Sequence, residues 1–304
     1  MNRRKAELAL VANAVIWGTT FVLVKAALGY ISTALYLAVR FSLATAALLV
    51  IYREIWKRPV PWKSLAAGGF TGALLYSGFI LQTSGLRFTT PSKSAFITGL
   101  STVMVPLLAA LVYKNRPHVS EVVGVLVATV GMGLMTLEGG AGSGLGSKVG
   151  SIVGSIGKGD WLTFGCAIAF AAHIVTLGHF SKRMSFQLLT VTQIGAAAVA
   201  ALALFPWIET PRVQWQPVVI WAIIITALLA TALAVTIQAW AMRYTTPTRS
   251  ALIFALEPIF AWITSFCLTG ESLSGRATAG AALILSGVIL VEMKPFNPRL
   301  HPSE

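Results

Sequence analysis

The stretch LRFTTPSKSAFITGL at residues 86–100 returns, with conservative changes, as MRYTTPTRSALIFAL at residues 242–256. The second copy lies 156 residues after the first. The correspondence extends without gaps at the same offset, as three further pairs show: Gln82 and Gln238, Gly124 and Gly280, and Gly131 and Gly287. An internal repeat of this size means that the chain is built from two similar units.

The composition is that of an integral membrane protein. The chain has 304 residues, of which 56% are hydrophobic and only 11% are charged, and its mean hydropathy is +0.77. Soluble domains carry about 25% charged residues, so this chain has too few to cover a surface that faces water. The net charge of +13 comes from short basic clusters between apolar runs. This pattern indicates a lipid bilayer as the partner rather than nucleic acid.

A helix needs about 20 mostly apolar residues to cross the hydrocarbon core of a membrane. Ten segments of this kind are present, at 7–28, 32–52, 65–86, 92–113, 119–138, 160–181, 186–206, 217–241, 248–270 and 274–292. The basic and then apolar N-terminus is interpreted as a retained first span rather than a signal peptide. The predicted fold is therefore an all-α membrane protein with ten transmembrane helices.

A Gly- and Ser-rich segment at 139–159 separates five predicted spans from five others, as expected of a flexible linker. We therefore predict a first five-helix repeat at 1–138, a second at 160–294, and a short tail at 295–304. Because five is odd, the second repeat must enter the membrane from the opposite side. Inverted repeats of this kind are a common architecture of secondary transporters, with the substrate site between the halves.

The distribution of lysine and arginine predicts the orientation. With the N-terminus inside, 15 of the 23 basic residues fall in inner segments and seven in outer segments, while Arg40 lies within a span. The positive-inside rule therefore places both termini in the cytoplasm. We expect the protein in the inner (plasma) membrane of a bacterial cell.

Several stretches in this order resemble one known family. They are WGTTFVLVK in the first span, VRFSLATAALL in the second, TTPSKSAFITGL, EPIFAWITSFCLTGESLS and the closing GAALILSGVIL. Together they are similar to the drug/metabolite transporter superfamily, and specifically to its EamA-like branch. The resemblance implies a ten-helix transporter, often an exporter of amino acids, metabolites or toxic compounds. One departure is that the Gly270–Glu271 pair of the second half is Lys114–Asn115 in the first.

Ionisable residues inside a membrane are costly and therefore mark candidate functional sites. Arg40 in the second span needs an anion, a set of carbonyls or a water-filled cavity, so it either pairs with Glu257, meets an anionic substrate, or bonds the backbone. Glu257 is the only carboxylate near the middle of a span, and next to Pro258 it also has the alternative role of satisfying freed backbone groups. His173 near the middle of the sixth span either hydrogen-bonds a neighbouring helix or, as we favour, lines the cavity.

Further polar and aromatic residues are weaker candidates for the same cavity. Gln82 and Gln238 are repeat mates that either contact substrate in alternate states or hydrogen-bond between helices. Trp17 either stacks on an aromatic or apolar substrate or, like most tryptophans of membrane proteins, anchors the chain at the membrane interface. The remaining candidates are Tyr36, Tyr76 and Gln193.

The repeated stretch itself predicts two helix starts, one at each face of the membrane. Thr90 and Thr246 are suited to cap the helices, and Pro91 and Pro247 to stand at the first helical position, where a missing N–H costs nothing. A cation in the first turn of a helix opposes the helix dipole. Lys93 and Arg249 must therefore gain something else, either a gate contact or, as we favour, exposure to lipid headgroups by snorkelling.

The sequence thus predicts a secondary transporter, and specifically an exporter, that moves small organic metabolites such as amino acids by alternating access. The alternatives are a translocator for sugar phosphates or nucleotide sugars, and an intramembrane lipid-modifying enzyme. We expect no enzyme because paired carboxylates and nucleophile–base pairs are missing from the sequence, and we expect no cofactor and no metal site. Proton coupling through Glu257 or His173 and formation of a homodimer stay open.

Overall fold

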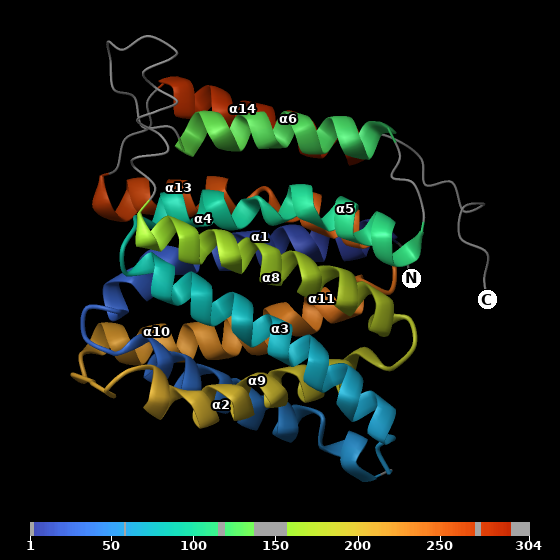
Figure 1. Ribbon diagram of the computed structural model, residues 1–304, viewed down its shortest axis with the longest axis vertical. Helices are drawn as coiled ribbons and strands as arrows, with labels where there is room; N and C mark the ends of the chain where they lie inside the picture. The colour runs from blue at the N-terminus through green and yellow to red at the C-terminus, as the bar shows by residue number, and fades with distance from the viewer. Residues whose placement is uncertain (1–2, 58, 115–118, 137–156, 271–274, 293–304) are drawn as a thin grey trace.

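The computed structural model describes residues 3–57, 59–114, 119–136, 157–270 and 275–292, and nearly all of them are helical (Figure 1). The first repeat contains α1 (Arg3–Ala27), α2 (Thr33–Ile51), the 3-10 turn η1 (Arg53–Lys57), α3 (Trp62–Leu86), α4 (Pro91–Gly99), α5 (Ser101–Tyr113) and α6 (Val119–Thr136). The second contains α8 (Lys158–Ser181), α9 (Phe186–Ile208), α10 (Pro217–Ala227), the π-helical turn η2 (Leu228–Leu233), α11 (Ala234–Ala241), α12 (Pro247–Phe254), α13 (Glu257–Thr269) and α14 (Gly275–Glu292).

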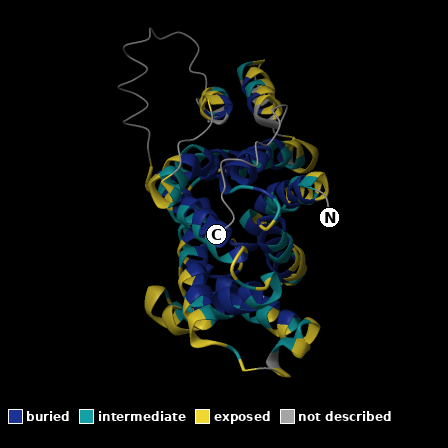
Figure 2. Ribbon diagram, turned by 90° about the vertical axis from the view of Figure 1, so that its right-hand side faces the viewer, coloured by how far each residue is buried: buried dark blue, intermediate teal, exposed yellow. Residues whose placement is uncertain are grey.

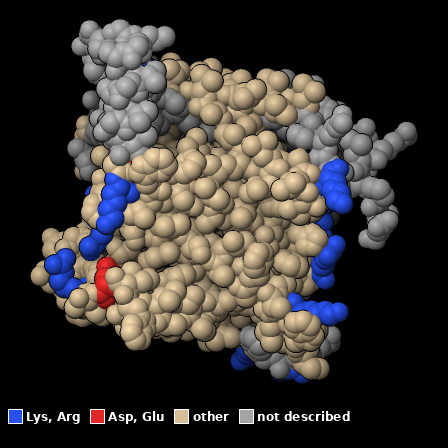
Figure 3. All heavy atoms as spheres, viewed as in Figure 1, with Lys and Arg blue, Asp and Glu red and all other residues tan. Residues whose placement is uncertain are grey.

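These helices make up ten spans when α4 is joined to α5, α10 to η2 and α11, and α12 to α13. Eight spans are long and apolar enough to cross a membrane, and two shorter apolar stretches lie within α6 and α14. Figure 3 shows a wide band without charged side chains on the visible face, with lysine and arginine gathered at its two ends. Figure 2, which looks toward one of those ends, shows buried residues inside the bundle and exposed ones on its outer faces. The structure thus agrees with the predicted ten-helix membrane protein.

Two spans are broken at equivalent positions of the repeat. Leu100 separates α4 from α5, and its mate Leu256 together with Ala255 separates α12 from α13. Both broken spans also end alike, because Lys114 and Gly270 stand 156 residues apart and both adopt a left-handed backbone conformation. The break carries different side chains in the two repeats, Ser101 in the first and Glu257 in the second.

The contacts of α1 show that the repeats are inverted. Near its end, the Lys25 ammonium donates hydrogen bonds to the carbonyls of Leu86, Arg87 and Thr89, just before α4 begins. Near its start, Glu7 pairs with Arg249 in the first turn of α12. Since α4 and α12 are repeat mates that begin at opposite ends of α1, the two halves cross the membrane in opposite directions.

The fifth and tenth spans, α6 and α14, pack against each other through glycines. A Cβ on Gly131 would lie 2.5 Å from the Gly280 carbonyl oxygen, and a Cβ on Gly287 would lie 2.6 Å from that of Gly124. The backbones touch only because these side chains are missing. Figure 1 shows this pair at the edge of the bundle, outside the other helices. The repeated glycines therefore serve the close packing of these two helices.

The predicted linker at 139–159 falls largely outside the described residues, and the predicted tail at 295–304 falls wholly outside them. The repeat boundaries drawn from the sequence therefore stay predictions. Asn115 and Glu271, which differ between the ends of the two broken spans, also lie outside the described residues.

Candidate functional site

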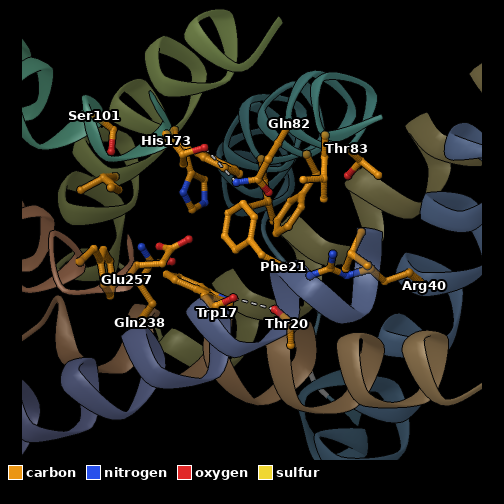
Figure 4. A pocket seen from close by; sticks show the side chains of 18 residues that line it. Trp17, Thr20, Phe21, Arg40, Gln82, Thr83, Ser101, His173, Gln238 and Glu257 are labelled. Atoms are coloured by element: carbon orange, nitrogen blue, oxygen red, sulfur yellow. Dashed lines mark hydrogen bonds between the residues drawn. The ribbon is translucent and has the colours of Figure 1, made fainter. Parts of the chain in front are cut away.

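A cavity lies between the two repeats, next to the broken helices (Figure 4). Its walls come from α1, α2, α3, α4 and α5 of the first repeat and from α8, α11, α12 and α13 of the second. Its volume is about 80 Å³, small beside the several hundred Å³ of pockets that hold drug-sized ligands. Its lining includes the polar and aromatic residues Trp17, Arg40, Gln82, His173, Gln238 and Glu257.

Within the part of the chain that the structure describes, Glu257 is the only carboxylate that lines this cavity. It is the first residue of α13, so the positive end of the helix dipole lies beside it. Among the described residues its carboxylate has neither a hydrogen bond nor an ion pair, unlike the carboxylates of Glu7, Glu54 and Asp160. Glu257 therefore offers an unpaired acceptor to whatever occupies the cavity.

Arg40 lies on the far side of the cavity and does not pair with Glu257 (Figure 4). Its Nε donates a hydrogen bond to the Thr231 hydroxyl at 2.8 Å, and its guanidinium lies 4.4 Å from the centre of the Phe79 ring. Thr231 belongs to the π-helical turn and itself donates to the Thr226 carbonyl at 2.8 Å. Of the three alternatives for Arg40, the observed contacts are closest to a structural one, although the partner is a hydroxyl and an aromatic face.

The π-helical turn also positions Trp17. A π turn leaves backbone carbonyls outside the regular ladder, and such turns occur frequently at functional sites. The Trp17 indole donates to the Ala230 carbonyl at 2.8 Å, and one turn earlier the Asn13 amide donates to the Ala234 carbonyl at 2.7 Å. These bonds join α1 to the other repeat and hold the indole at the cavity, where its ring centre lies 4.9 Å from that of Phe254.

The two glutamines and the histidine differ in their bonding. Gln82 donates to the Thr98 hydroxyl at 3.2 Å, whereas no hydrogen bond from the Gln238 side chain is present among the described residues. The His173 Nε2 lies 2.9 Å from the Gln193 Oε1, which ties the imidazole to α9 while its ring still lines the cavity. The repeat mates Gln82 and Gln238 thus both reach the cavity, but only Gln238 is unpartnered there.

Three predicted cavity residues lie elsewhere. Tyr36 is fully buried, and its hydroxyl lies 2.7 Å from that of Thr226. Tyr76 packs edge-on against Phe41, and Gln193 is buried behind His173. The expectation that these three line the cavity was wrong, because helix periodicity alone does not say which of two packed faces borders the open space.

The repeated stretch forms the two predicted helix caps. The Thr90 hydroxyl accepts a hydrogen bond from the backbone N–H of Lys93 at 3.2 Å, and the Thr246 hydroxyl accepts one from that of Arg249 at 3.3 Å. Pro91 and Pro247 occupy the first helical positions. Both caps and both proline positions are confirmed.

The two cations that follow these caps form ion pairs between the repeats instead of reaching for lipid. Lys93 on α4 pairs with Asp160 on α8 at 2.9 Å, and Arg249 on α12 pairs with Glu7 on α1 at 3.5 Å. The Arg249 side chain is only 8% exposed. The favoured interpretation of snorkelling was therefore wrong, since a nearby carboxylate neutralises each cation better than the helix start disfavours it.

The partners of these cations were missed at the sequence level. Glu7 and Asp160 each stand near the start of the first helix of their repeat, but the looser alignment of those helices hid the correspondence. Ser101 was missed as well, although its position 156 residues before Glu257 marks it as the repeat mate. Within the described part of the chain, no group of three or more His, Cys, Asp or Glu side chains is placed to hold a metal ion.

Comparison with solved structures finds the same fold in another protein. One crystal structure of a protein superposes with a TM-score of 0.73 over 95% of this chain and 97% of that one, at 18% identity. At this identity the likeness shows the fold alone.

Comparisons of sequence add the family. An uncharacterized transporter of Archaeoglobus fulgidus is 32% identical over 97% of this chain and 88% of its own length, and the uncharacterized transporter YyaM of Bacillus subtilis is 27% identical over 97% and 96%. A chloroplastic WAT1-related protein of Arabidopsis thaliana is 22% identical over 95% of this chain and 69% of its own length. The model of the EamA-like transporter family matches residues 4–137 and again 157–293. The chain belongs to the EamA-like transporter family of the drug/metabolite transporter superfamily, and it is a multi-pass membrane transporter.

Proposed function

We propose that this protein is a secondary transporter that exports small organic metabolites from the cytoplasm by alternating access. The observation that carries the proposal is the position of the cavity: it lies between two inverted repeats, beside the breaks of two equivalent spans, and one ion pair joins the repeats at each face. A site in this position can be reached from either face by a movement of one repeat against the other.

The two ion pairs give this movement a physical basis. Lys93 and Asp160 hold the repeats together at the face where α4 begins, and Arg249 and Glu7 do so at the face where α12 begins. In each pair, the cation belongs to one repeat and the carboxylate to the other. Opening a path to the cavity at either face requires the repeats to separate there, so we expect each pair to break when its own face opens.

Additional contacts close the face that carries Lys93. The loop after α1 pairs with the loop before α10 through an isolated antiparallel bridge between Ile31 and Val213. The Ser32 amide donates to the Arg212 carbonyl at 2.8 Å, and the Glu209 carboxylate accepts from the Ala34 amide at the start of α2. These contacts also join the two repeats, so this face is closed by a short network rather than by one pair.

The basic residues support an orientation with both termini in the cytoplasm of a bacterial cell and the Lys93 face outside. The proposed direction, export, rests on the family, whose members are often exporters. The alternative of a phosphate-bearing substrate is less well supported. Phosphate sites gather several cations, whereas Arg40 is the only lysine or arginine among the lining residues, and it is already engaged by Thr231 and Phe79. An enzyme would need a catalytic group set that the lining does not supply.

Transport is tested by expressing the protein in cells and comparing the extracellular metabolites with those of cells that carry an empty vector. Compounds that accumulate outside are then tested as substrates in proteoliposomes that contain the purified protein. Export of a compound class in cells and its flux in proteoliposomes support the proposal. If purified, folded protein moves none of the compounds that cells release in its presence, the proposal fails.

Coupling to protons is part of the same proposal and is tested separately. Glu257 and His173 are the titratable residues that line the cavity, and the cation that faces them from α2 is Arg40. Flux of an identified substrate is measured in proteoliposomes with and without an imposed pH difference, for the natural protein and for Glu257→Gln. If the pH difference drives flux and the variant loses this response, proton coupling is supported; equal responses contradict a role of Glu257 in coupling.

A further inference from the structure

The charged residues that line the cavity differ in whether their side chains already have partners. On the α2 side, Arg40 already has a hydroxyl and an aromatic face as partners. On the α13 side, Glu257 and Gln238 have no side-chain partner among the described residues. Figure 4 shows Glu257, Gln238 and Trp17 together on one side and Arg40 on the other, with Phe21 and Thr20 between them. The unpartnered carboxylate of Glu257 therefore lies beside the Gln238 amide, whose oxygen is a second acceptor.

Aromatic rings stand beside these acceptors. The rings of Trp17 and Phe254 are tilted by 58°, with centres 4.9 Å apart, and both residues line the cavity with Glu257. The indole N–H of Trp17 is used by the Ala230 carbonyl, so this residue offers the ligand its ring rather than its donor. A carboxylate next to an indole face is chemically suited to a cation, because the carboxylate supplies charge-assisted hydrogen bonds and the ring face attracts positive charge.

Building on the proposed transport function, we propose that the substrate is a small organic cation: an amine with an apolar or aromatic body and without a carboxylate or phosphate group. Its ammonium binds the Glu257 carboxylate and the Gln238 side-chain oxygen, and its body packs against Trp17 and Phe254. Glu257 is thus the residue that determines specificity.

The cavity disfavours the other charge classes. An anion would meet the Glu257 carboxylate without gaining a free cation, since Arg40 is engaged by Thr231 and Phe79. A zwitterion would place its own carboxylate either next to Glu257 or against Phe21 and Thr20, neither of which carries a positive charge. A neutral compound would form at most a hydrogen bond with Glu257 and would gain nothing from charge pairing. The small volume of about 80 Å³ favours a body no larger than one ring or a short alkyl chain.

The test uses four probes of similar shape and different charge: phenethylamine, 2-phenylethanol, phenylalanine and 3-phenylpropionate. Binding to the purified full-length protein in detergent is measured by calorimetry and by the shift of the thermal unfolding midpoint. We expect phenethylamine to bind at least tenfold more tightly than each of the other three. The proposal is overturned if phenylalanine or 3-phenylpropionate binds as tightly as phenethylamine or more tightly, or if none of the four binds.

Two variants test whether the preference for the amine depends on the charge of Glu257. Glu257→Gln keeps the shape and removes the charge, so we expect it to weaken phenethylamine at least tenfold while 2-phenylethanol changes by less than threefold. Glu257→Asp keeps the charge and should retain part of the affinity. Glu54→Gln is the control, because Glu54 is 65% exposed and does not line the cavity. Unchanged phenethylamine affinity in a folded Glu257→Gln protein overturns the proposal, and if that variant does not fold, the probe series on the natural protein decides.

Flux measured in proteoliposomes separates this proposal from the transport function. If an anion or a zwitterion is carried and amines are neither bound nor carried, the substrate class is wrong while transport stands. If amines bind through Glu257 but nothing is carried, the class stands while transport fails.

Discussion

Replacing one carboxylate at each face should shift the conformational equilibrium in opposite directions. The variants are Asp160→Asn, which leaves Lys93 unpaired, and Glu7→Gln, which removes the carboxylate that both Arg249 and Arg3 contact. Asparagine retains an oxygen that can accept the hydrogen bond now donated by the Gly157 amide, so the start of α8 should be preserved. If each ion pair forms only while its face is closed, its loss favours the state in which that face is open.

The exposures of the two pairs determine the expected magnitudes. Lys93 and Asp160 are 32% and 9% exposed, and partly solvated pairs are worth about 1 kcal/mol or less, which corresponds to at most a roughly fivefold shift in the equilibrium. Arg249 and Glu7 are 8% and 10% exposed. Removing one partner of a buried pair costs about 3–5 kcal/mol, so the shift at the Arg249 face should be at least roughly a hundredfold.

The assay measures how fast a thiol in the cavity is modified from each face. Thr20 lines the cavity, so Thr20→Cys is introduced into a chain in which Cys166 and Cys267 are replaced by alanine. A membrane-impermeant thiol reagent is applied to oriented vesicles. From the Lys93 face, Asp160→Asn should raise the modification rate up to about fivefold and Glu7→Gln should lower it, while the exposed control Glu54→Gln should leave it unchanged.

The outcome that refutes the reasoning is specific. If both variants change modification from the Lys93 face in the same direction while remaining folded, the ion pairs do not act at opposite faces of one equilibrium. They would then be structural contacts that stabilise the bundle in all states.

Three further variants test how the helices hold the cavity. Gly131→Ala places a Cβ 2.5 Å from the Gly280 carbonyl oxygen and should destabilise the protein by about 1–3 kcal/mol in detergent unfolding, whereas Gly69→Ala, with open space around it, should not. Gly18→Ala places a Cβ 2.6 Å from the Glu257 carbonyl oxygen and should abolish most transport by separating α1 from α13; normal flux would contradict this contact. Trp17→Phe leaves the Ala230 carbonyl without its donor and should cost about 1–3 kcal/mol of stability, unlike Trp161→Phe at a 62% exposed position.

Much of the fold could be predicted because the repeat and the hydropathy are local properties of the chain. The matched stretches at 86–100 and 242–256 predicted two helix starts at opposite faces, and the caps of Thr90 and Thr246 bear this out. The mild breaks at Leu100 and Leu256 were not predicted, since neither residue is a helix breaker. The π-helical turn at 228–233 was missed for a similar reason, because an apolar run does not reveal how its backbone bonds are arranged.

The candidate site was only partly predictable because it depends on contacts between distant helices. Polarity inside a span correctly marked Glu257, Arg40 and His173 as unusual, and all three line the cavity. Polarity does not reveal the partner, however, so the engagement of Arg40 by Thr231 across the repeats could not be foreseen. The same limit applies to Tyr36, whose hydroxyl bonds Thr226 away from the cavity.

The two repeats carry equivalent charged residues at the faces of the molecule but different residues at its centre. The proposed mechanism explains both observations. Each face must close in turn, so equivalent cations at 93 and 249 meet carboxylates of the opposite repeat. The substrate, in contrast, occupies a single site that is shared by both states. One carboxylate is enough there, and a second at position 101 would place two negative charges around one ligand. Ser101 opposite Glu257 therefore fits a site for a single positive charge, reached through two matched gates.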